Sequence, residues 1–343
     1  MIVSESWEEL VSRGANGGEL SRAESAQVFD ALMTGRIPPD DVEQFLRGLA
    51  KRGETVEEIV GAAGVMRRHV TSIRCEAPNA IDTCGTGGDG ISTFNVSTAA
   101  AIIASAAGAV VAKHGNRTNS RASGSAEVLT ALGVRIEASP AVVERCIREI
   151  GIGFLFAAQL HPAMAIVKDV RRKIGTPTIF NLLGPLTNPA IVRRQIIGVP
   201  RVELVEKVAA ALAALGAERA FVVHGHDGLC DLTICEASTV AEVRDGRVTL
   251  RTICPEDAKL GRGGLDELRV TSPANSAATI GEVLDGQTGP RRDHALLNAG
   301  LALVVAGIAG DLSEGVKSAG RAIDTGTARE KLRRLVEISG SAE

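Results

Sequence analysis

The sequence contains no tyrosine and one tryptophan, and aromatic residues make up only 2% of its 343 positions. Side chains on which nucleobases stack are therefore scarce. The formal net charge is −3, so no basic excess is present to attract nucleic acid or an anionic membrane surface. Both shortages argue against nucleic-acid and membrane partners.

Paired cysteines and a leader segment are also missing. The six cysteines include no C-x-x-C pair, which indicates reduced, mostly buried thiols in a reducing compartment. The acidic start lacks the basic head and apolar core of a signal peptide. The longest apolar stretches, 99–112 and 295–309, are rich in small residues and are typical of buried elements, not membrane spans. A cytoplasmic location is predicted.

The pattern changes once along the chain. Residues 5–74 have helical periodicity, with a capping box at Ser21 and a helix start at Pro38 and Pro39. From Ala80 onward, glycine-punctuated strands alternate with helices, as in residues 202–225. We therefore predict an α/β protein in which a small all-α domain precedes a larger domain with a mainly parallel sheet surrounded by helices.

The run GTGGDG at 85–90 has four glycines in six residues. Such a loop brings backbone N–H groups close to anionic oxygens. Its spacing matches neither the G-x-G-x-x-G fingerprint nor the Walker pattern. Taken alone, the loop is equally consistent with phosphate binding and with a plain strand–helix turn.

Two further runs strengthen the phosphate interpretation. Residues 95–104 predict a helix of small residues whose first turn offers free N–H groups, with the hydroxyls of Ser97 and Thr98 beside them. The apolar run 108–112 predicts a buried parallel strand with Lys113 and Arg117 at its C-terminal end, where ligands of open α/β sheets collect. Together the three runs predict a site for a diphosphate on a sugar.

The chain resembles the anthranilate phosphoribosyltransferase family of the nucleoside phosphorylase-like class. The resemblance rests on KHGNR at 113–117, SGSAEVL at 123–129, HPAM at 161–164, VRR at 170–172, NLLGPLTNP at 181–189, GPRRD at 289–293 and LLNA at 296–299. It implies transfer of the phosphoribosyl group of 5-phosphoribosyl 1-diphosphate to the amine of anthranilate in tryptophan biosynthesis. It also implies Mg²⁺ as cofactor and a homodimer as the usual state.

The resemblance further implies which residues form the site. No catalytic nucleophile is expected, because the donor carries a good leaving group and positioning and electrostatics suffice. Donor binding is assigned to Gly85, Gly88, Asp89, Thr93, Asn95, Val96, Ser97, Thr98, Lys113, His114, Gly115, Asn116, Arg117, Ser120, Arg121 and Ser125. Anthranilate binding is assigned to Gly85, Asn116 and Arg171, with Arg171 offering a planar fork to the carboxylate.

Several of these residues have a plainer interpretation. Asn95 is also a typical helix cap, and Asp89 a typical turn residue. Arg171 precedes two more cations and is in isolation better explained as solvated. His114 is expected to pack in the core or against the acceptor, and His161 to shape a turn.

The resemblance also implies the domain boundaries. In the family, a segment after HPAM returns to the helical unit. We therefore expect a small helical domain at 1–74 with a returning segment near 166–186, and a large donor-binding α/β domain formed by 75–165 and 187–343. The acceptor would then bind at the hinge between the two domains.

The metal site departs from the family pattern. An Asp-Glu pair is expected in HGxDGLDE, whereas residues 224–231 read HGHDGLCD, which puts Cys230 at the Asp position and Asp231 at the Glu position. A thiol is a poor ligand for Mg²⁺. The expected ligands are therefore Ser97 and Asp231, helped by Asp227 or Glu236, with more water in the metal's shell.

Two other outcomes of this departure stay open. One is a weakened enzyme. The other is the same fold with a different acceptor or a non-catalytic role, as in the nucleic-acid-binding relatives of the family. A further departure lies nearby, because Arg121-Ala122 stands where the family has Ser-Lys, so a cation is kept one position earlier.

Overall fold

The structure is a computed structural model that describes residues 5–118 and 121–341. Its N-terminal part is a bundle of four helices: α1 (Trp7–Ala15), α2 (Arg22–Met33), α3 (Pro39–Arg52) and α4 (Val56–Arg68). Ser21 caps α2 through a capping box with Glu24, and α3 begins at Pro39. Both predicted helix starts are confirmed.

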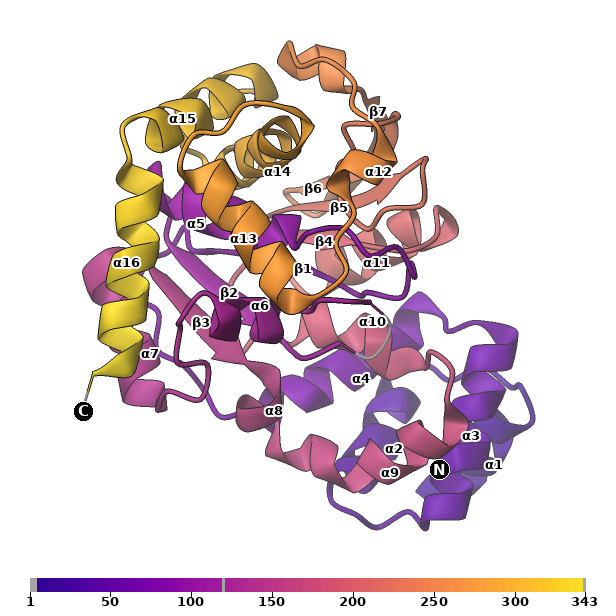
Figure 1. Ribbon diagram of the computed structural model, residues 1–343. Coiled ribbons are helices and arrows are strands. Elements are labelled where there is room, and N and C mark those ends of the chain that lie inside the picture. The colour runs from indigo at the N-terminus through magenta and orange to yellow at the C-terminus, as the bar shows by residue number, and fades with distance from the viewer. Residues whose placement is uncertain (1–4, 119–120, 342–343) are drawn as a thin grey trace.

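A later segment of the chain packs on this bundle. Helix α9 (Ala165–Ile174) contacts α3, and α10 (Ile179–Leu186) contacts α4. Phe180 of α10 lies edge-on to Phe29 of α2, with 5.8 Å between the ring centroids. Figure 1 shows α9 beside the indigo helices of the bundle.

The sheet has seven strands in the order β3-β2-β1-β4-β5-β6-β7. Five neighbouring strands are parallel, and two antiparallel strands close one edge. The strands are β1 (Ile81–Gly85), β2 (Val111–Gly115), β3 (Ile152–Phe156), β4 (Arg194–Gly198), β5 (Arg219–Gly225), β6 (Ser238–Arg244) and β7 (Arg247–Ile253). The chain winds outward in both directions from β1 and β4, and the boundary between the two directions is where open α/β sheets bind ligands. The predicted fold class is confirmed.

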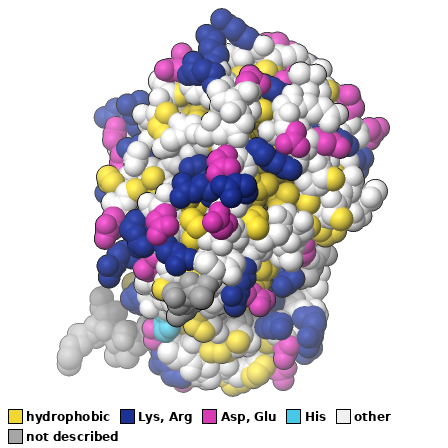
Figure 2. All heavy atoms as spheres, turned by 60° about the vertical axis from the view of Figure 1, so that its left-hand side comes forward, with side chains coloured by type: hydrophobic (Ala, Val, Ile, Leu, Met, Phe, Trp, Pro, Cys, Tyr) yellow, Lys and Arg dark blue, Asp and Glu magenta, His cyan; other side chains and the backbone are white. Residues whose placement is uncertain are grey.

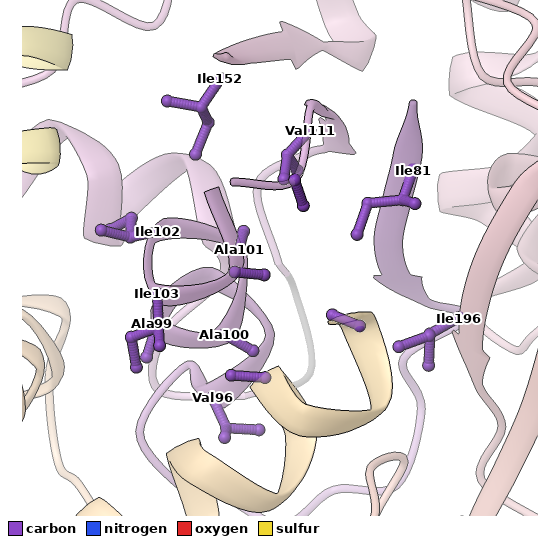
Figure 3. Close-up of a cluster of buried hydrophobic side chains, with 14 of the residues drawn as sticks. Ile81, Val96, Ala99, Ala100, Ala101, Ile102, Ile103, Val111, Ile152 and Ile196 are labelled. Atoms are coloured by element: carbon purple, nitrogen blue, oxygen red, sulfur yellow. The ribbon is translucent and has the colours of Figure 1, made fainter. Parts of the chain in front are cut away.

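Helices cover both faces of the sheet (Figure 1). They are α5 (Val96–Ala106), α6 (Ser125–Ala131), α7 (Pro140–Ile150), α8 (Ala157–Leu160), α11 (Glu203–Ala214), α12 (Leu265–Leu268), α13 (Pro273–Leu284), α14 (Pro290–Ala306), α15 (Leu312–Asp324) and α16 (Thr327–Gly340), with 3-10 turns at Pro162–Met164 and Pro255–Ala258. Figure 3 shows the small side chains of α5 gathered beside Ile81, Val111 and Ile152 of the sheet.

Two apolar clusters lie on opposite faces of the sheet, because successive strand residues point to opposite sides. Ile196 of β4 packs in the cluster with α5 and α14, and the next residue, Ile197, packs in the cluster with α11. The α11 cluster also contains Phe29 and Phe45 of the helical bundle. One continuous core therefore runs from the bundle to the sheet.

Two expectations need correction. The strand predicted at 108–112 is β2 at Val111–Gly115, so Lys113 lies inside the strand and not after it. Of the six cysteines, all of them free thiols, only Cys146 and Cys230 are buried.

Among the helices of the described residues, none is both long and apolar enough to cross a membrane.

Candidate active site

The glycine loop lies at the boundary between β1 and β4, at the carboxyl ends of both strands. Gly85 pairs with Gly198, and the Thr86 N–H donates to the Gly198 carbonyl oxygen at 2.9 Å. A Cβ added at Gly198 would lie 1.6 Å from the Cys230 carbonyl oxygen. The loop, the end of β4 and the segment around Cys230 therefore meet backbone to backbone.

Asp89 joins three segments and is more than a turn residue. Its side chain is fully buried and forms a two-pronged ion pair with the guanidinium of Arg121. It also accepts the N–H of Ile91 at 3.3 Å and that of Cys230 at 3.2 Å. Asp89 and Arg121 thus fix the glycine loop to the loop after β2 and to the Cys230 segment.

The N-terminus of α5 lies at the same edge of the sheet. Asn95 caps the helix, because its side-chain oxygen accepts the Thr98 N–H at 3.0 Å and the Ser97 hydroxyl at 3.2 Å. The capping interpretation therefore describes its contacts in this structure. Val96 is buried in the core, and its N–H donates to the Phe94 carbonyl oxygen at 2.7 Å.

Lys113 lies beneath this helix terminus. Its ammonium donates to the Thr83 carbonyl oxygen at 2.6 Å and to the Ser97 hydroxyl at 3.3 Å. The side chain is buried, which lowers the pKa of its ammonium from the ordinary value. A buried cation at a helix N-terminus is a strong attractor for a phosphate.

The hydroxyls of Thr93 and Thr98 are buried without a hydrogen-bond partner among the described residues. Thr93 pairs with Arg269 in an isolated bridge, which fixes the segment before α5 to the segment before α13. Gly88 has a φ of +92°, in the left-handed region that favours glycine. Ser120 lies outside the described residues.

The end of β2 and the segment after it contain several predicted site residues: Asn116 was assigned to both substrates, and Gly115, Arg117 and Ser125 to the donor. Asn116 is exposed, and its side-chain oxygen accepts the Arg117 N–H at 2.8 Å. The Asn116 carbonyl oxygen accepts the Ser125 hydroxyl at 3.3 Å, and Gly115 faces Ser125 so closely that a Cβ would lie 2.3 Å from the hydroxyl oxygen. Arg117 instead lies over the Phe156 ring, 5.6 Å from its centroid.

His114 and His161 form a buried pair, with 3.1 Å between their Nε2 atoms. Burial is the main reason that the pKa of His114 falls to about 3 and that of His161 to about 4. Both rings are therefore neutral at physiological pH. This favours a packing role over acid–base chemistry.

Arg171 differs from the two cations that follow it. Arg172 pairs with Asp169 at 2.9 Å, and Lys173 pairs with Glu43 at 2.6 Å. Arg171 has no carboxylate partner within the described ranges; its guanidinium lies over the Phe180 ring, 5.4 Å from the centroid, and its burial lowers the pKa. An unpaired, partly buried guanidinium is suited to bind a carboxylate from a ligand.

Asp231 is the acidic group available to a metal. No side chain or N–H of the described residues hydrogen bonds to its carboxylate, and burial with the nearby Asp89 charge raises its pKa to about 7. Such a carboxylate is suited to a cation, and Mg²⁺ needs only one or two carboxylates besides substrate phosphates. The described residues contain no group of three or more His, Cys, Asp or Glu side chains arranged around a metal.

The two expected helpers of Asp231 are engaged elsewhere. Asp227 accepts the Leu229 N–H at 3.2 Å and the Thr233 hydroxyl, and Glu236 pairs with Arg262 at 3.2 Å. Cys230 is buried, with its thiol 3.9 Å from the Gly87 carbonyl oxygen, and burial raises its pKa well above the ordinary value. A neutral thiol does not replace the missing carboxylate.

Sequence reasoning missed two features of this site. One is the mutual pairing of Asp89 and Arg121, which lie 32 positions apart. The other is Asn298, which hydrogen bonds to the backbone of Leu232 from 66 positions away. The LLNA motif drew attention to Asn298, but nothing in the sequence says which backbone it contacts.

Two family models cover most of the chain. The helical bundle domain of a glycosyl transferase family matches residues 8–70, and the a/b domain of a glycosyl transferase family matches residues 77–329. The fold and the site thus define a two-domain glycosyl transferase.

Comparison with individual relatives shows which kind of glycosyl transferase the chain resembles. The chain is 51% identical over 329 residues to an anthranilate phosphoribosyltransferase from Anaeromyxobacter sp. (strain K), covering 96% of this chain and 97% of the relative. A solved anthranilate phosphoribosyltransferase from Thermus thermophilus superimposes with a TM-score of 0.92 at 40% identity, over 97% of this chain and 99% of that one. The enzyme from Saccharomyces cerevisiae, solved in complex with PRPP and Mg, gives 0.88 at 27% identity, over 98% and 99% of the two chains. The chain belongs to the anthranilate phosphoribosyltransferase family.

Proposed function

We propose that the protein transfers the phosphoribosyl group of 5-phosphoribosyl 1-diphosphate to the amine of anthranilate, giving N-(5-phosphoribosyl)anthranilate and diphosphate, in tryptophan biosynthesis. One observation supports this proposal most directly: the N-terminus of α5 and the buried Lys113 lie together at the boundary between β1 and β4. This arrangement is suited to an anion, and family membership identifies that anion as the donor's diphosphate.

In the proposed reaction, the amine nitrogen bonds to the anomeric carbon as the carbon–oxygen bond to diphosphate breaks, and the amine then loses one proton. An arylamine is already a neutral nucleophile, so no base is required to start the step. The α5 N-terminus and Lys113 stabilise the negative charge that collects on the leaving diphosphate. The chain's contribution is therefore orientation and electrostatics.

The acceptor is held by its carboxylate. Arg171 supplies an unpaired guanidinium from α9, and Asn116 supplies an amide from the end of β2. Because the two residues come from different parts of the fold, binding of anthranilate between them would align the amine with the donor.

We further propose Mg²⁺ as the cofactor. The yeast relative was solved with PRPP and Mg, and Asp231 and Ser97 are the residues of this chain that would hold the ion. When bound, Mg²⁺ neutralises diphosphate charge. Asp231 fits this role because its carboxylate has no partner among the described residues and carries a raised pKa.

The remaining assignments are also proposals. We propose the donor-binding and anthranilate-binding residues given above, a homodimer, a cytoplasmic location, and the domain division at 1–74 with 166–186 against 75–165 with 187–343. The contacts of α9 and α10 with α3 and α4 support that division. Figure 2 shows Lys and Arg side chains intermingled with Asp and Glu on one face, which gives no support to a basic nucleic-acid groove there.

The decisive test follows anthranilate fluorescence after addition of the donor, with Mg²⁺ and with EDTA. We expect consumption only with Mg²⁺. Donor binding without anthranilate consumption would contradict the proposed reaction, and it would mean either that the acceptor is a different amine or that the site around Cys230 is inactive. Consumption in EDTA would contradict the role of the metal.

A further inference from the structure

Asn298 is a buried polar residue that the proposed reaction leaves without a role. It lies on α14, is 6% exposed, and has buried apolar neighbours at Leu297, Ala299 and Leu301. A side-chain amide in such surroundings must have its hydrogen bonds satisfied. The partners of this amide therefore indicate the role of Asn298.

The amide of Asn298 binds both backbone groups of one loop residue. Its nitrogen donates to the Leu232 carbonyl oxygen at 2.9 Å, and its oxygen accepts the Leu232 N–H at 3.1 Å. The second amide proton goes to the His294 carbonyl oxygen, one helical turn earlier, also at 2.9 Å. That third bond fixes the orientation of the amide. The other two bonds pair with the N–H and the carbonyl group of Leu232, as the backbone of a neighbouring β-strand would.

Leu232 is adjacent to Asp231, and the other side of Asp231 is also fixed. The Cys230 N–H donates to the buried carboxylate of Asp89 at 3.2 Å. The side chain of Leu232 is fully buried. The backbone is therefore anchored on both sides of Asp231, whereas the Asp231 carboxylate itself has no hydrogen bond within the described residues.

We propose that Asn298 is a positioning residue that holds Asp231 where it can bind the magnesium of the donor complex. This inference rests on the proposed function. Asn298 does not touch the metal or the substrates; it acts through the backbone of Leu232. Residues that orient metal ligands typically change metal affinity or activity by about 10–100-fold when they are replaced.

The test uses Asn298→Leu, which keeps the branched shape of the side chain and removes all three hydrogen bonds. Leu303→Ala is the matched control, because Leu303 is fully buried on the same helix and its truncation perturbs packing while the hydrogen-bonding groups of Asn298 and Leu232 are kept. Calorimetry measures binding of 5-phosphoribosyl 1-diphosphate to the full-length protein over a magnesium series, without anthranilate. This readout does not depend on turnover.

We expect the magnesium concentration for half-maximal donor binding to rise about 10-fold or more in Asn298→Leu. Saturating magnesium should restore binding, because the ligand is displaced and not lost. Leu303→Ala should keep the wild-type magnesium dependence. If Asn298→Leu does not fold, Asn298→Asp serves instead, since it keeps an acceptor for the Leu232 N–H and loses both donors; the same direction of change is expected.

An unchanged magnesium dependence in the Asn298 variants, or an equal change in Leu303→Ala, would overturn the positioning role and leave the proposed function intact. A wild-type protein that binds donor with magnesium but leaves anthranilate unconsumed would contradict the proposed function, through either a different acceptor or an inactive site. In that case a magnesium shift in Asn298→Leu would still support the positioning role.

Discussion

Among the three neighbouring cations at 171–173, Arg171 is the one whose surroundings indicate that it binds a carboxylate from a ligand. Its neighbours Arg172 and Lys173 are paired with Asp169 and Glu43, whereas its guanidinium rests on the Phe180 ring without a carboxylate in the described chain. A planar fork binds a carboxylate through two parallel bonds that an ammonium cannot reproduce. The distinction between adjacent cations can therefore be tested by conservative substitution.

We expect Arg171→Lys to raise the KM for anthranilate by roughly 10–100-fold, which corresponds to the loss of about 1.5–3 kcal/mol from a charged hydrogen bond. The KM for the donor should stay close to wild type. Steady-state kinetics with each substrate varied in turn measures both. Arg172→Lys is the control, and an equal effect there would contradict the assignment.

Cys230 offers a second test at the residue scale. A carboxylate at this position would lie beside Asp89, which already accepts the Cys230 N–H, and next to Asp231. Like charges in a buried site destabilise it. Cys230→Asp should therefore melt at a lower temperature than wild type in EDTA, recover with Mg²⁺, and need less Mg²⁺ for activity.

Cys230→Ser, which adds no charge, separates the effect of the carboxylate from that of losing the thiol. Thermal melts and magnesium titrations of both variants show whether a carboxylate at position 230 changes stability and the magnesium requirement. Identical magnesium titrations for wild type and Cys230→Asp would mean that the missing carboxylate has no consequence.

Individual residues differ in how far the sequence predicts them. Asn95 is predictable as a helix cap because helix starts have a local signature, whereas Lys113 was expected at the end of a strand and lies inside β2. The pairing of Asp89 with Arg121 and the contact of Asn298 with Leu232 are not, because both depend on which segments the folded chain brings together. Contacts of this kind require the fold as well as the motif.

At the scale of elements, the N-terminus of α5 begins a helix, and in the proposed site it also faces the donor. Asn95→Ala removes the cap, which should lower the free energy of unfolding by about 1 kcal/mol and weaken donor binding. Asp311→Ala removes a similar cap, which accepts the Glu314 N–H of α15 at 2.8 Å. We expect a similar stability loss there without a change in donor affinity.

Urea unfolding and donor titration of both variants measure the two effects separately. If Asn95→Ala loses stability but binds donor as tightly as wild type, Asn95 has only the capping role. If both variants lose donor affinity equally, the effect is one of global stability.

The sequence predicts helices better than strand limits. Strand β5 lies at the predicted residues, but β2 begins later than expected because Gly108, with a φ of +104°, and Ala109 complete the turn out of α5. The hairpin of β6 and β7 was not predicted. Its turn, Asp245-Gly246, has positive φ at both residues, and this dipeptide is a strong hairpin signal.

At the scale of the whole molecule, buried neutral histidines make stability depend on pH. The pKa of His114 is about 3, that of His161 about 4 and that of His294 about 3, all below the ordinary value because of burial. The unfolded chain therefore binds more protons below pH 6.5, and stability falls as the pH drops from there toward the folded values. Each histidine costs about 2 kcal/mol between pH 7 and pH 5.

His294→Leu should flatten this dependence, since both ring nitrogens of His294 are buried without a partner in the described chain. Urea unfolding at pH 7 and pH 5 measures the change. We expect the variant to lose about 2 kcal/mol less than wild type on acidification. Equal losses would show that His294 does not stay neutral in the folded protein.

The two-part architecture was predictable from periodicity, because helices alone and then alternating strands and helices follow each other along the chain. The position of α9 and α10 was not predictable from periodicity, since nothing in a helical pattern says which core it joins. Phe180 lies against Phe29 only because the chain turns back after η1 (Pro162–Met164).

The continuous core beneath α11 also determines how this chain can be recombined. Phe45 of the bundle and Val222 of β5 belong to the same apolar cluster. The helical bundle therefore cannot be replaced by the bundle of a distant relative while the sheet and its helices are left unchanged. Its inner face and the covered face of the sheet must change together, so chimeras divided at the linker before β1 would inherit mismatched halves of one interior.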